Sequence, residues 1–407
     1  MHLAVLNSNR MKTSSPVTES IKSCSEYAIR LKSFWSYAFA IFGIDMCKRG
    51  QESRKKRIVF IALAITQLFI FFHYISCLIY NFALESTVSG LSFYTGMLAC
   101  ICLSIFNLWT MNRRKVAMTK LLDESIFFLS GHPECTKCLW RYSLIPSIGL
   151  FAMTIAEASF SSVEVFTRDN AGIRNLTAMH LFKINFAIEY LYIARILISV
   201  EFIVSVLICM GFVNISVWFF NHMCHLVFYR FKHLNMKLEE LLRSGKQLSS
   251  FDLAEYRAQH QLACQVTEEL SCLWSPLIVV WMFGFILGLC FNMKALQVEF
   301  RALFLIAYLT DISRQLWLIV GLFKAASLVN VEAHKLAVKL VTFPISQLAF
   351  TDADKMEYYF NYLLLSERLV NTRIGINASG LFLLNASSFL SMAGTVLTYV
   401  IVLYQSH

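Results

Sequence analysis

The fold is decided by the stretch 380-GLFLLNASSFLSMAGTVLTYVIVLYQSH-407, which contains no Asp, Glu, Lys or Arg. About twenty apolar residues in a helix cross the roughly 30 Å hydrocarbon core of a bilayer. Small and polar residues recur within the stretch at spacings of three, four or seven and therefore share one helical face. They are Ser387, Ser391, Gly394, Thr398 and Gln405. The pattern predicts a membrane-spanning helix whose polar stripe either packs on neighbouring helices or faces water.

The composition of the whole chain indicates a polytopic membrane protein. Of its 407 residues, 57% are hydrophobic and only 15% are charged, which is too apolar for a soluble surface. The net charge of +10 comes from short basic blocks beside apolar runs, as membrane topology requires. We therefore expect membrane lipid as a partner and no nucleic acid.

Hydropathy predicts an all-α protein with seven transmembrane helices. The expected spans are Ile58–Phe82, Gly90–Met111, Leu144–Phe166, Phe186–Trp218, Leu273–Asn292, Ala302–Leu322 and Ala378–Tyr404. The corresponding organisation has helices one to four at 58–220, helices five and six at 273–322, and a seventh helix at 378–407.

The distribution of basic residues predicts the orientation of these spans. Six Lys or Arg residues lie at 48–57 and another six at 113–141, whereas the loops on the alternate side hold few. The positive-inside rule then places the N-terminal segment 1–57 in the cytoplasm and the C-terminus outside. The segments 221–272 and 323–377 are long, charged and patterned as amphipathic helices, so we expect a helical cytoplasmic anchor layer.

Several motifs bear on modification, metal binding and catalysis. The sequon at Asn175 lies in a predicted external loop and is the expected glycosylation site. His132, Cys135 and Cys138 have a zinc-like spacing but lack an evident fourth ligand, so we predict no metal site and no cofactor. The chain has no nucleophile elbow, phosphate-binding glycine loop or HExxH motif, and we do not expect an enzyme.

Ionisable residues within predicted spans point to a ligand cavity, because each must pair or face water. Together with neighbouring aromatic residues they would provide the mixture of walls and polar groups that suits a small ligand. The candidate ligand-binding residues are Tyr94, Glu157, Phe160, Tyr192, Arg195, Phe285, Tyr308, Asp311 and Gln315. The alternative is that Arg195 pairs with Glu189 or Asp311 for structure alone, and that the aromatic residues belong to the core or to an interfacial belt.

The last helix allows two interpretations of its polar stripe. Close packing through small residues is common between membrane helices. Thr398, Ile401, Val402 and Gln405 would instead suit a narrow pore in which apolar side chains gate and the amide coordinates ions. Composition alone leaves both open.

Thr398, Tyr399, the five residues 400–404 and Gln405 resemble the TY-x5-QF signature that closes the seventh helix of insect gustatory receptors. Gly380 and Phe382 resemble the residues that often open that helix, whereas Ser406 departs from the usual phenylalanine. The length, seven spans and inverted orientation are also similar to this family, which is related to insect odorant receptors.

The resemblance implies a tetrameric, ligand-gated, non-selective cation channel, homomeric or heteromeric, in the plasma membrane of chemosensory neurons. It implies that the helix at 378–407 lines the pore, with Thr398, Ile401, Val402 and Gln405 as pore and gate, and that the internal helices mediate assembly. Val400 stands where receptors similar to the trehalose type have glutamate, which leaves fructose-type and bitter-type tastants. A G-protein-coupled chemoreceptor, which needs an external N-terminus, and a secondary transporter are the alternatives.

Overall fold

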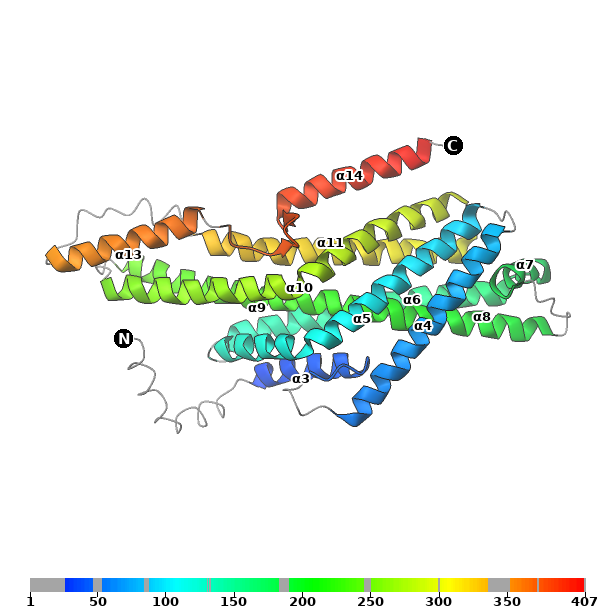
Figure 1. Cartoon of the computed structure of the whole chain (residues 1–407), viewed down its shortest axis with the longest axis horizontal. Coiled ribbons are helices and arrows are strands. Elements are labelled where there is room, and N and C mark those ends of the chain that lie inside the picture. Colours follow the sequence, from blue (N-terminus) through cyan, green and yellow to red (C-terminus); the bar gives the residue numbers. More distant parts are fainter. Residues whose placement is uncertain are drawn as a thin grey trace.

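The computed structural model describes residues 26–46, 53–83, 88–129, 131, 133–182, 190–244, 250–298, 301–335, 352–371 and 373–405. The described chain is nearly all helical (Figure 1). Its helices are α3 (Glu26–Ala40), α4 (Arg54–Ala83), α5 (Val88–Leu129), α6 (Pro133–Thr167), α7 (Asn170–His180), α8 (Leu191–Ser205), the π-helix η3 (Val206–Met210), α9 (Gly211–Arg243), α10 (Ser250–Val298), α11 (Ala302–His334), α13 (Asp352–Asn371) and α14 (Ala386–Gln405). Two short strands, β1 (Asn377–Ala378) and β2 (Phe382–Leu383), form an antiparallel hairpin.

Six helical segments of the described chain are long and apolar enough to cross a membrane: α4, α5, α6, α8 continued through α9, α10 and α11. They contain the first six predicted spans, apart from the first five residues of the fourth: residues 186–189 lie outside the described residues, and Tyr190 precedes α8. Helix α14 adds a seventh segment of 20 residues. The predicted all-α polytopic fold is confirmed, while its orientation stays a prediction.

Several helices are much longer than a bilayer requires. Helix α5 has 42 residues and α10 has 49, so they extend over about 63 Å and 74 Å at 1.5 Å per residue. Their extra turns run toward α13, which packs against α10 at the left of Figure 1. Here the apolar residues of α10 are interleaved with charged ones, which is the pattern of a helix in water rather than lipid. We name the two ends of the bundle the α13 end and the α7 end.

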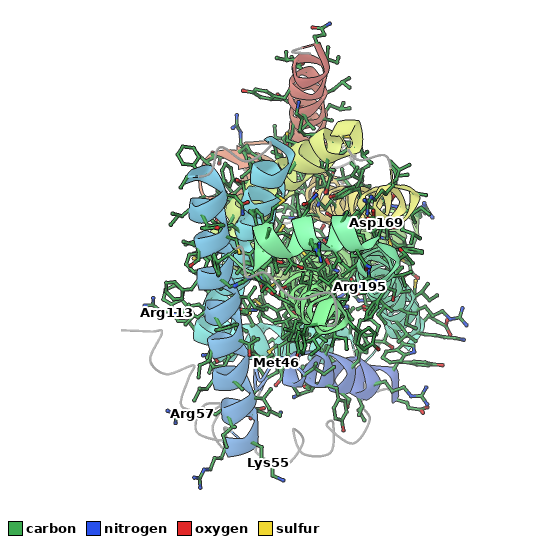
Figure 2. The ribbon with its side chains drawn as sticks, turned by 90° about the vertical axis from the view of Figure 1, so that its right-hand side faces the viewer. Met46, Lys55, Arg57, Arg113, Asp169 and Arg195 are labelled. Atoms are coloured by element: carbon green, nitrogen blue, oxygen red, sulfur yellow. The ribbon has the colours of Figure 1, made fainter. Side chains whose placement is uncertain are left out.

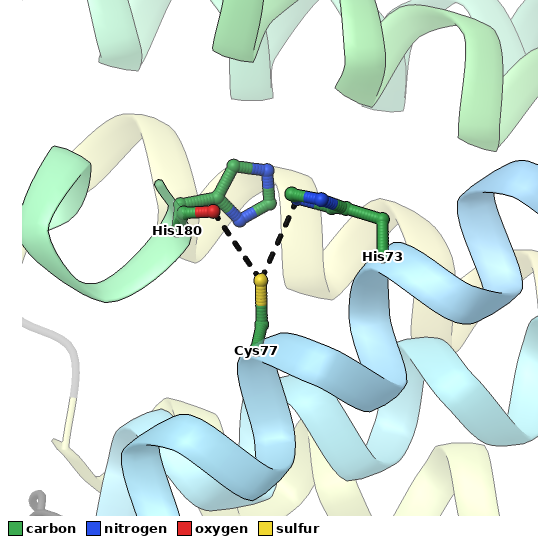
Figure 3. A group of neighbouring side chains, drawn as sticks. All are labelled: His73, Cys77 and His180. Atoms are coloured by element: carbon green, nitrogen blue, oxygen red, sulfur yellow. Dashed lines mark hydrogen bonds between the residues drawn. The ribbon is translucent and has the colours of Figure 1, made fainter. Parts of the chain in front are cut away.

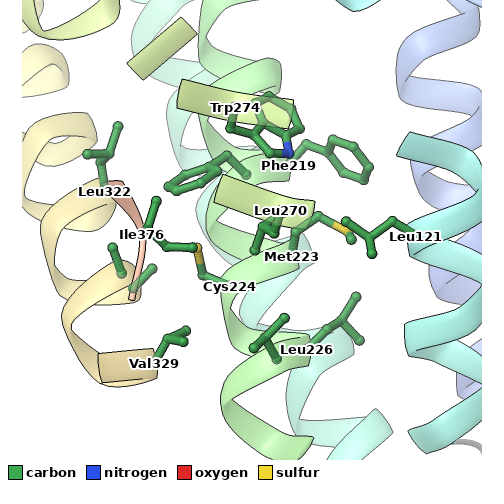
Figure 4. Packing of buried hydrophobic residues seen from close by; sticks show 14 of the residues in the cluster. Leu121, Phe219, Met223, Cys224, Leu226, Leu270, Trp274, Leu322, Val329 and Ile376 are labelled. Atoms are coloured by element: carbon green, nitrogen blue, oxygen red, sulfur yellow. The ribbon is translucent and has the colours of Figure 1, made fainter. Parts of the chain in front are cut away.

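Helix α9 forms the centre of the core. Between Gly211 and Val227 every residue except Ile215 is buried, so this helix is enclosed on all sides. Phe219 packs edge-on against Trp274 of α10 with ring centroids 5.7 Å apart, and Leu322 and Ile376 complete the cluster in Figure 4. A helix buried around its whole circumference needs such a bundle, in which buried polar side chains of α9 such as Asn214 and His222 have polar neighbours on other helices.

The C-terminal stretch differs from the predicted continuous span Ala378–Tyr404. Its first residues form the β1–β2 hairpin, whose turn needs positive φ at Ser379 (52°) and Gly380 (78°). Helix α14 begins only at Ala386, because Asn385 caps it: Ser388 N donates to Asn385 Oδ1 at 2.9 Å, and Asn385 N donates to Ser388 Oγ at 3.0 Å. This reciprocal cap satisfies two backbone donors that the first turn leaves unpaired.

Candidate functional site

A buried ion cluster joins α6 to α11 in the half of the bundle toward the α7 end. Arg314 is fully enclosed; its Nε lies 3.3 Å from Glu157 Oε2, and its Nη2 bonds to Asp311 Oδ1. Two carboxylates share one guanidinium, which compensates charges that would otherwise be costly inside a membrane.

Polar side chains from two further helices complete this cluster. Arg314 Nη1 donates to Asn214 Oδ1 of α9 at 2.9 Å. Asp311 Oδ2 accepts from Asn292 Nδ2 of α10 at 2.6 Å and from Gln315 Nε2 at 2.8 Å. Gly288 of α10 makes room for the amide of Gln315, because a Cβ there would lie 2.7 Å from Gln315 Oε1. The cluster therefore braces four helices, and it brings together three predicted ligand residues, namely Glu157, Asp311 and Gln315.

Arg195 has a different position from the one expected of a cavity residue. It lies at the α7 end, as does Asp169, and this end faces the viewer in Figure 2. Its guanidinium donates to Phe166 O at 2.8 Å and to Arg168 O at 2.6 Å, the carbonyls where α6 ends. Such contacts satisfy a helix C-terminus, which a cation also stabilises through the helix dipole.

The predicted aromatic residues are dispersed. Phe285 is buried, Phe160 and Tyr308 are half-buried, and Tyr192 is 64% exposed. Tyr94 is fully buried and lies in a separate cluster with His180.

This separate cluster contains side chains from four elements, namely Tyr94 of α5 and residues of α4, α7 and α8, and is shown in part in Figure 3. His73 and Cys77 lie one turn apart on α4, and His180 ends α7; one ligand atom from each lies within 4.8 Å of the others. Glu201 of α8 adds a carboxylate whose Oε2 lies 2.9 Å from His180 Nε2. We did not predict this cluster from the sequence. The i, i+4 spacing of His73 and Cys77 indicates only that these two side chains share a helix face.

The predicted pore residues all lie on α14. Thr398, Ile401, Val402 and Gln405 are exposed in the single chain, and Thr398 Oγ1 donates to Gly394 O at 2.9 Å. Helix α14 rises away from the other helices toward the C-terminus in Figure 1. Its lower part contacts α11, where Phe389 and Phe323 have ring centroids 5.4 Å apart.

Some of the basic residues from which the orientation was predicted lie at the start of α4. Lys55 and Arg57 extend from the first turn of α4 in Figure 2. A cavity of about 280 Å³ lies beside them, lined in part by Asp45, Arg57 and Lys115. Asp45 Oδ2 accepts from Ser53 N at 2.7 Å, which helps to start α4.

Two further sequence features remain, the glycosylation sequon at Asn175 and the zinc-like triplet for which we predicted no metal site. Asn175 is exposed on α7, and its glycosylation stays a prediction. Of the zinc-like triplet, His132 lies outside the described residues, and Cys138 Sγ accepts a hydrogen bond from the Tyr229 hydroxyl at 3.3 Å.

Comparison with known proteins identifies the family. The family model described as 7tm chemosensory receptor matches residues 33–407. The solved structure of the insect olfactory receptor OR5 from Machilis hrabei in complex with eugenol has a TM-score of 0.72 and 14% identity, covering 94% of this chain and 100% of that one. A second structure of the same receptor has a TM-score of 0.60 with the same identity and coverage. No curated protein matches this chain significantly. Because the family model matches nearly all of its length, this chain belongs to the 7tm chemosensory receptor family.

Proposed function

We propose that this receptor is a taste receptor that acts as a ligand-gated, non-selective cation channel, with α14 from four subunits around the pore. The observation that carries the proposal is the isolation of α14. Its 20 residues span about 30 Å, yet its upper part has exposed side chains on several faces, including Leu397 and Tyr399, each 60% exposed.

Assembly around a water-filled pore would explain the distribution of residues along α14. Its Thr398 hydroxyl is satisfied by its own helix, but a Gln405 amide facing hydrocarbon would be costly. A central pore gives this amide water and passing ions, while Ile401 and Val402 form the apolar constriction one turn below. Lipid or neighbouring subunits would cover the other faces of α14, on one of which Tyr399 lies.

The agonist cavity is proposed in the half toward the α7 end, which the basic residues predict to be extracellular. Its candidates are the residues named from the sequence other than Arg195, with Phe160, Phe285 and Tyr308 as walls and the ion cluster as a polar floor. Arg314 and Asp311 lie on α11, and the same helix contacts α14 through Phe323 and Phe389. A ligand that moves α11 against α6 would therefore act on the pore helix through this aromatic pair.

Family membership supports a multi-pass membrane protein that recognises a small molecule, since the similar receptor OR5 is described in complex with eugenol. The proposal extends this to a tastant, of the fructose or bitter type, at the plasma membrane of chemosensory neurons. Subunits of one or of two kinds are both compatible with it.

Substitutions in α14 test the channel proposal. In cells with verified surface delivery, Gln405→Ala and Ile401→Ala should change the relative permeability to cations or the unitary conductance of agonist-evoked currents. Tyr399→Ala, on another face of the same helix about 100° from Thr398, is the matched control and should leave permeation unchanged.

Unaltered permeation in both pore variants would remove α14 from the pore. An N-terminal epitope accessible on intact cells would overturn the orientation and favour a G-protein-coupled receptor, and substrate uptake without current would favour a transporter. Counting photobleaching steps of single labelled complexes should give four subunits.

A further inference from the structure

We propose that His73, Cys77, His180 and Glu201 bind one divalent transition-metal ion, with Zn²⁺ as the ion that best fits these donors. Imidazole nitrogen, thiolate sulfur and carboxylate oxygen are the donors that Zn²⁺ takes in proteins, and four of them make a tetrahedral site. The site goes beyond the proposed channel function and does not depend on it.

Two distances between donor atoms match those of a tetrahedral site. A ring nitrogen of His180 and the sulfur of Cys77 lie within 4.8 Å of each other and would have to draw closer around the ion. Bonds of about 2.0–2.1 Å to nitrogen or oxygen and about 2.3 Å to sulfur place ligand atoms roughly 3.3–3.6 Å apart. His73 Nε2 lies 3.5 Å from Cys77 Sγ and 3.5 Å from Glu201 Oε1. His180 Nε2 is 2.9 Å from Glu201 Oε2, so these two side chains need to separate by only about half an ångström to admit the ion.

The surroundings orient the ligands. The Tyr94 hydroxyl lies 3.3 Å from His180 Nδ1, so a proton on Nδ1 can be donated to Tyr94 while Nε2 faces the ion. A second group that holds the far nitrogen in this way is the usual support of a metal-bound histidine. Asn81 fixes the end of α7 against α4, because its Nδ2 donates to Met179 O at 2.9 Å.

The carboxylate of Glu201 has an oxygen atom available for a metal ion at this cluster. Glu201 Oε1 is a buried atom with no hydrogen-bond partner among the residues that the structure describes. Cys77 Sγ donates to His180 O at 3.3 Å, and this thiol proton is lost to solvent when the thiolate binds the ion. A cation would thus satisfy the carboxylate, and its affinity should rise with pH as the thiol becomes easier to deprotonate.

A metal ion could reach the site from the surface, and its binding would link three helices. The His73 and Glu201 side chains are 15% and 20% exposed, so they can meet an ion arriving from the surface. The ring of Phe182, whose φ is 54°, lies beside His73 with the two ring centroids 5.9 Å apart. Binding would join α4, α7 and α8, three elements at the α7 end, into one rigid unit.

The test is metal binding by the purified full chain, prepared without a polyhistidine tag. Equilibrated with Zn²⁺ and analysed by elemental mass spectrometry, the protein should hold one ion per chain and unfold at a higher temperature than after chelation. Cys77→Ser and His180→Gln should abolish both effects. Tyr94→Phe should weaken binding by about tenfold, as loss of a supporting hydrogen bond does elsewhere.

The matched control is Cys209→Ser, another buried cysteine next to the same cluster that offers the site no ligand; it should bind Zn²⁺ as the parent protein does. Co²⁺ provides a second measurement, because a thiolate-to-cobalt charge-transfer band should appear in the parent protein and be missing in Cys77→Ser. Excess Ca²⁺ or Mg²⁺, which prefer oxygen ligands, should not compete. The proposal would be overturned if the parent protein failed to bind Zn²⁺, or if Cys77→Ser and His180→Gln bound it as tightly as the parent protein does. Either result would count whether or not the chain conducts ions.

Discussion

The guanidinium Nε of Arg314 lies 3.3 Å from Glu157 Oε2, and this buried ion pair joins α11 to α6. Asp311 binds the same guanidinium from one helical turn away, so Arg314 balances two carboxylates. At about 1.5 Å per residue, Glu157 and Asp311 each lie roughly 14 Å from the helix end nearest α7, deep within the span. The cluster is therefore both a structural brace and the polar floor of the proposed agonist cavity.

We predict that Arg314→Gln destabilises the folded protein by about 3–5 kcal/mol, because it leaves two buried carboxylates without their cation. Thermal unfolding in lipid nanodiscs and the amount at the cell surface measure the effect. Arg301→Gln is the control: that guanidinium pairs with Glu164 at 3.1 Å but is 42% exposed, so its loss should cost less than about 1 kcal/mol. Equal effects of the two substitutions would contradict the assigned role of Arg314.

A second prediction concerns the close approach of α10 and α11 beside this cluster. In Gly288→Ala the new Cβ would lie 2.7 Å from Gln315 Oε1 and 2.8 Å from its Nε2. Because Nε2 is held by Asp311, the amide cannot move freely, and we expect destabilisation by about 1–3 kcal/mol. Gly96→Ala, whose Cβ would meet Phe291 at an ordinary 3.4 Å, should be nearly neutral in the same thermal measurement. An unchanged stability of Gly288→Ala would show that the Gln315 amide can adopt another conformation without losing stability.

The helical spans were predictable because they need only composition and length, whereas the hairpin before α14 was not. Its strands have two residues each, and an apolar stretch such as Phe382–Leu384 has the same hydropathy in a strand or a helix. Hydropathy alone identifies the ionisable side chains within the spans, namely Glu157, Asp311 and Arg314. Which of their atoms pair depends on how α6 and α11 pack against each other. His73 and His180 are 107 positions apart along the chain, and only the packing of α7 on α4 brings them together.

The start of α14 gives a third prediction. Asn385→Ala removes the acceptor of Ser388 N and should cost about 1 kcal/mol, fraying the first turn of the proposed pore helix. Agonist-evoked current normalised to surface protein should fall, since a frayed first turn weakens the contact between Phe389 and Phe323. Asn385→Asp keeps the acceptor and should retain the current. The exposed neighbour Ser387, changed to alanine, is the positional control. A loss of current in Asn385→Asp equal to that in Asn385→Ala would show that capping is not the reason.

The last prediction separates a structural role of Arg195 from a ligand contact. Its guanidinium bonds to Phe166 O and Arg168 O, so Arg195→Gln should lower stability by about 1–2 kcal/mol and reduce the surface amount. Among molecules that reach the surface, the agonist concentration for half-maximal current should not change, because the side chain is occupied by the end of α6. Leu197→Ala is the control on the same helix, with a residue that is 51% exposed and not among the proposed ligand contacts, and it should alter neither quantity. A shift in half-maximal concentration at normal stability would instead place Arg195 in the agonist cavity, and α6 would then need another partner for its terminal carbonyls in the bound state.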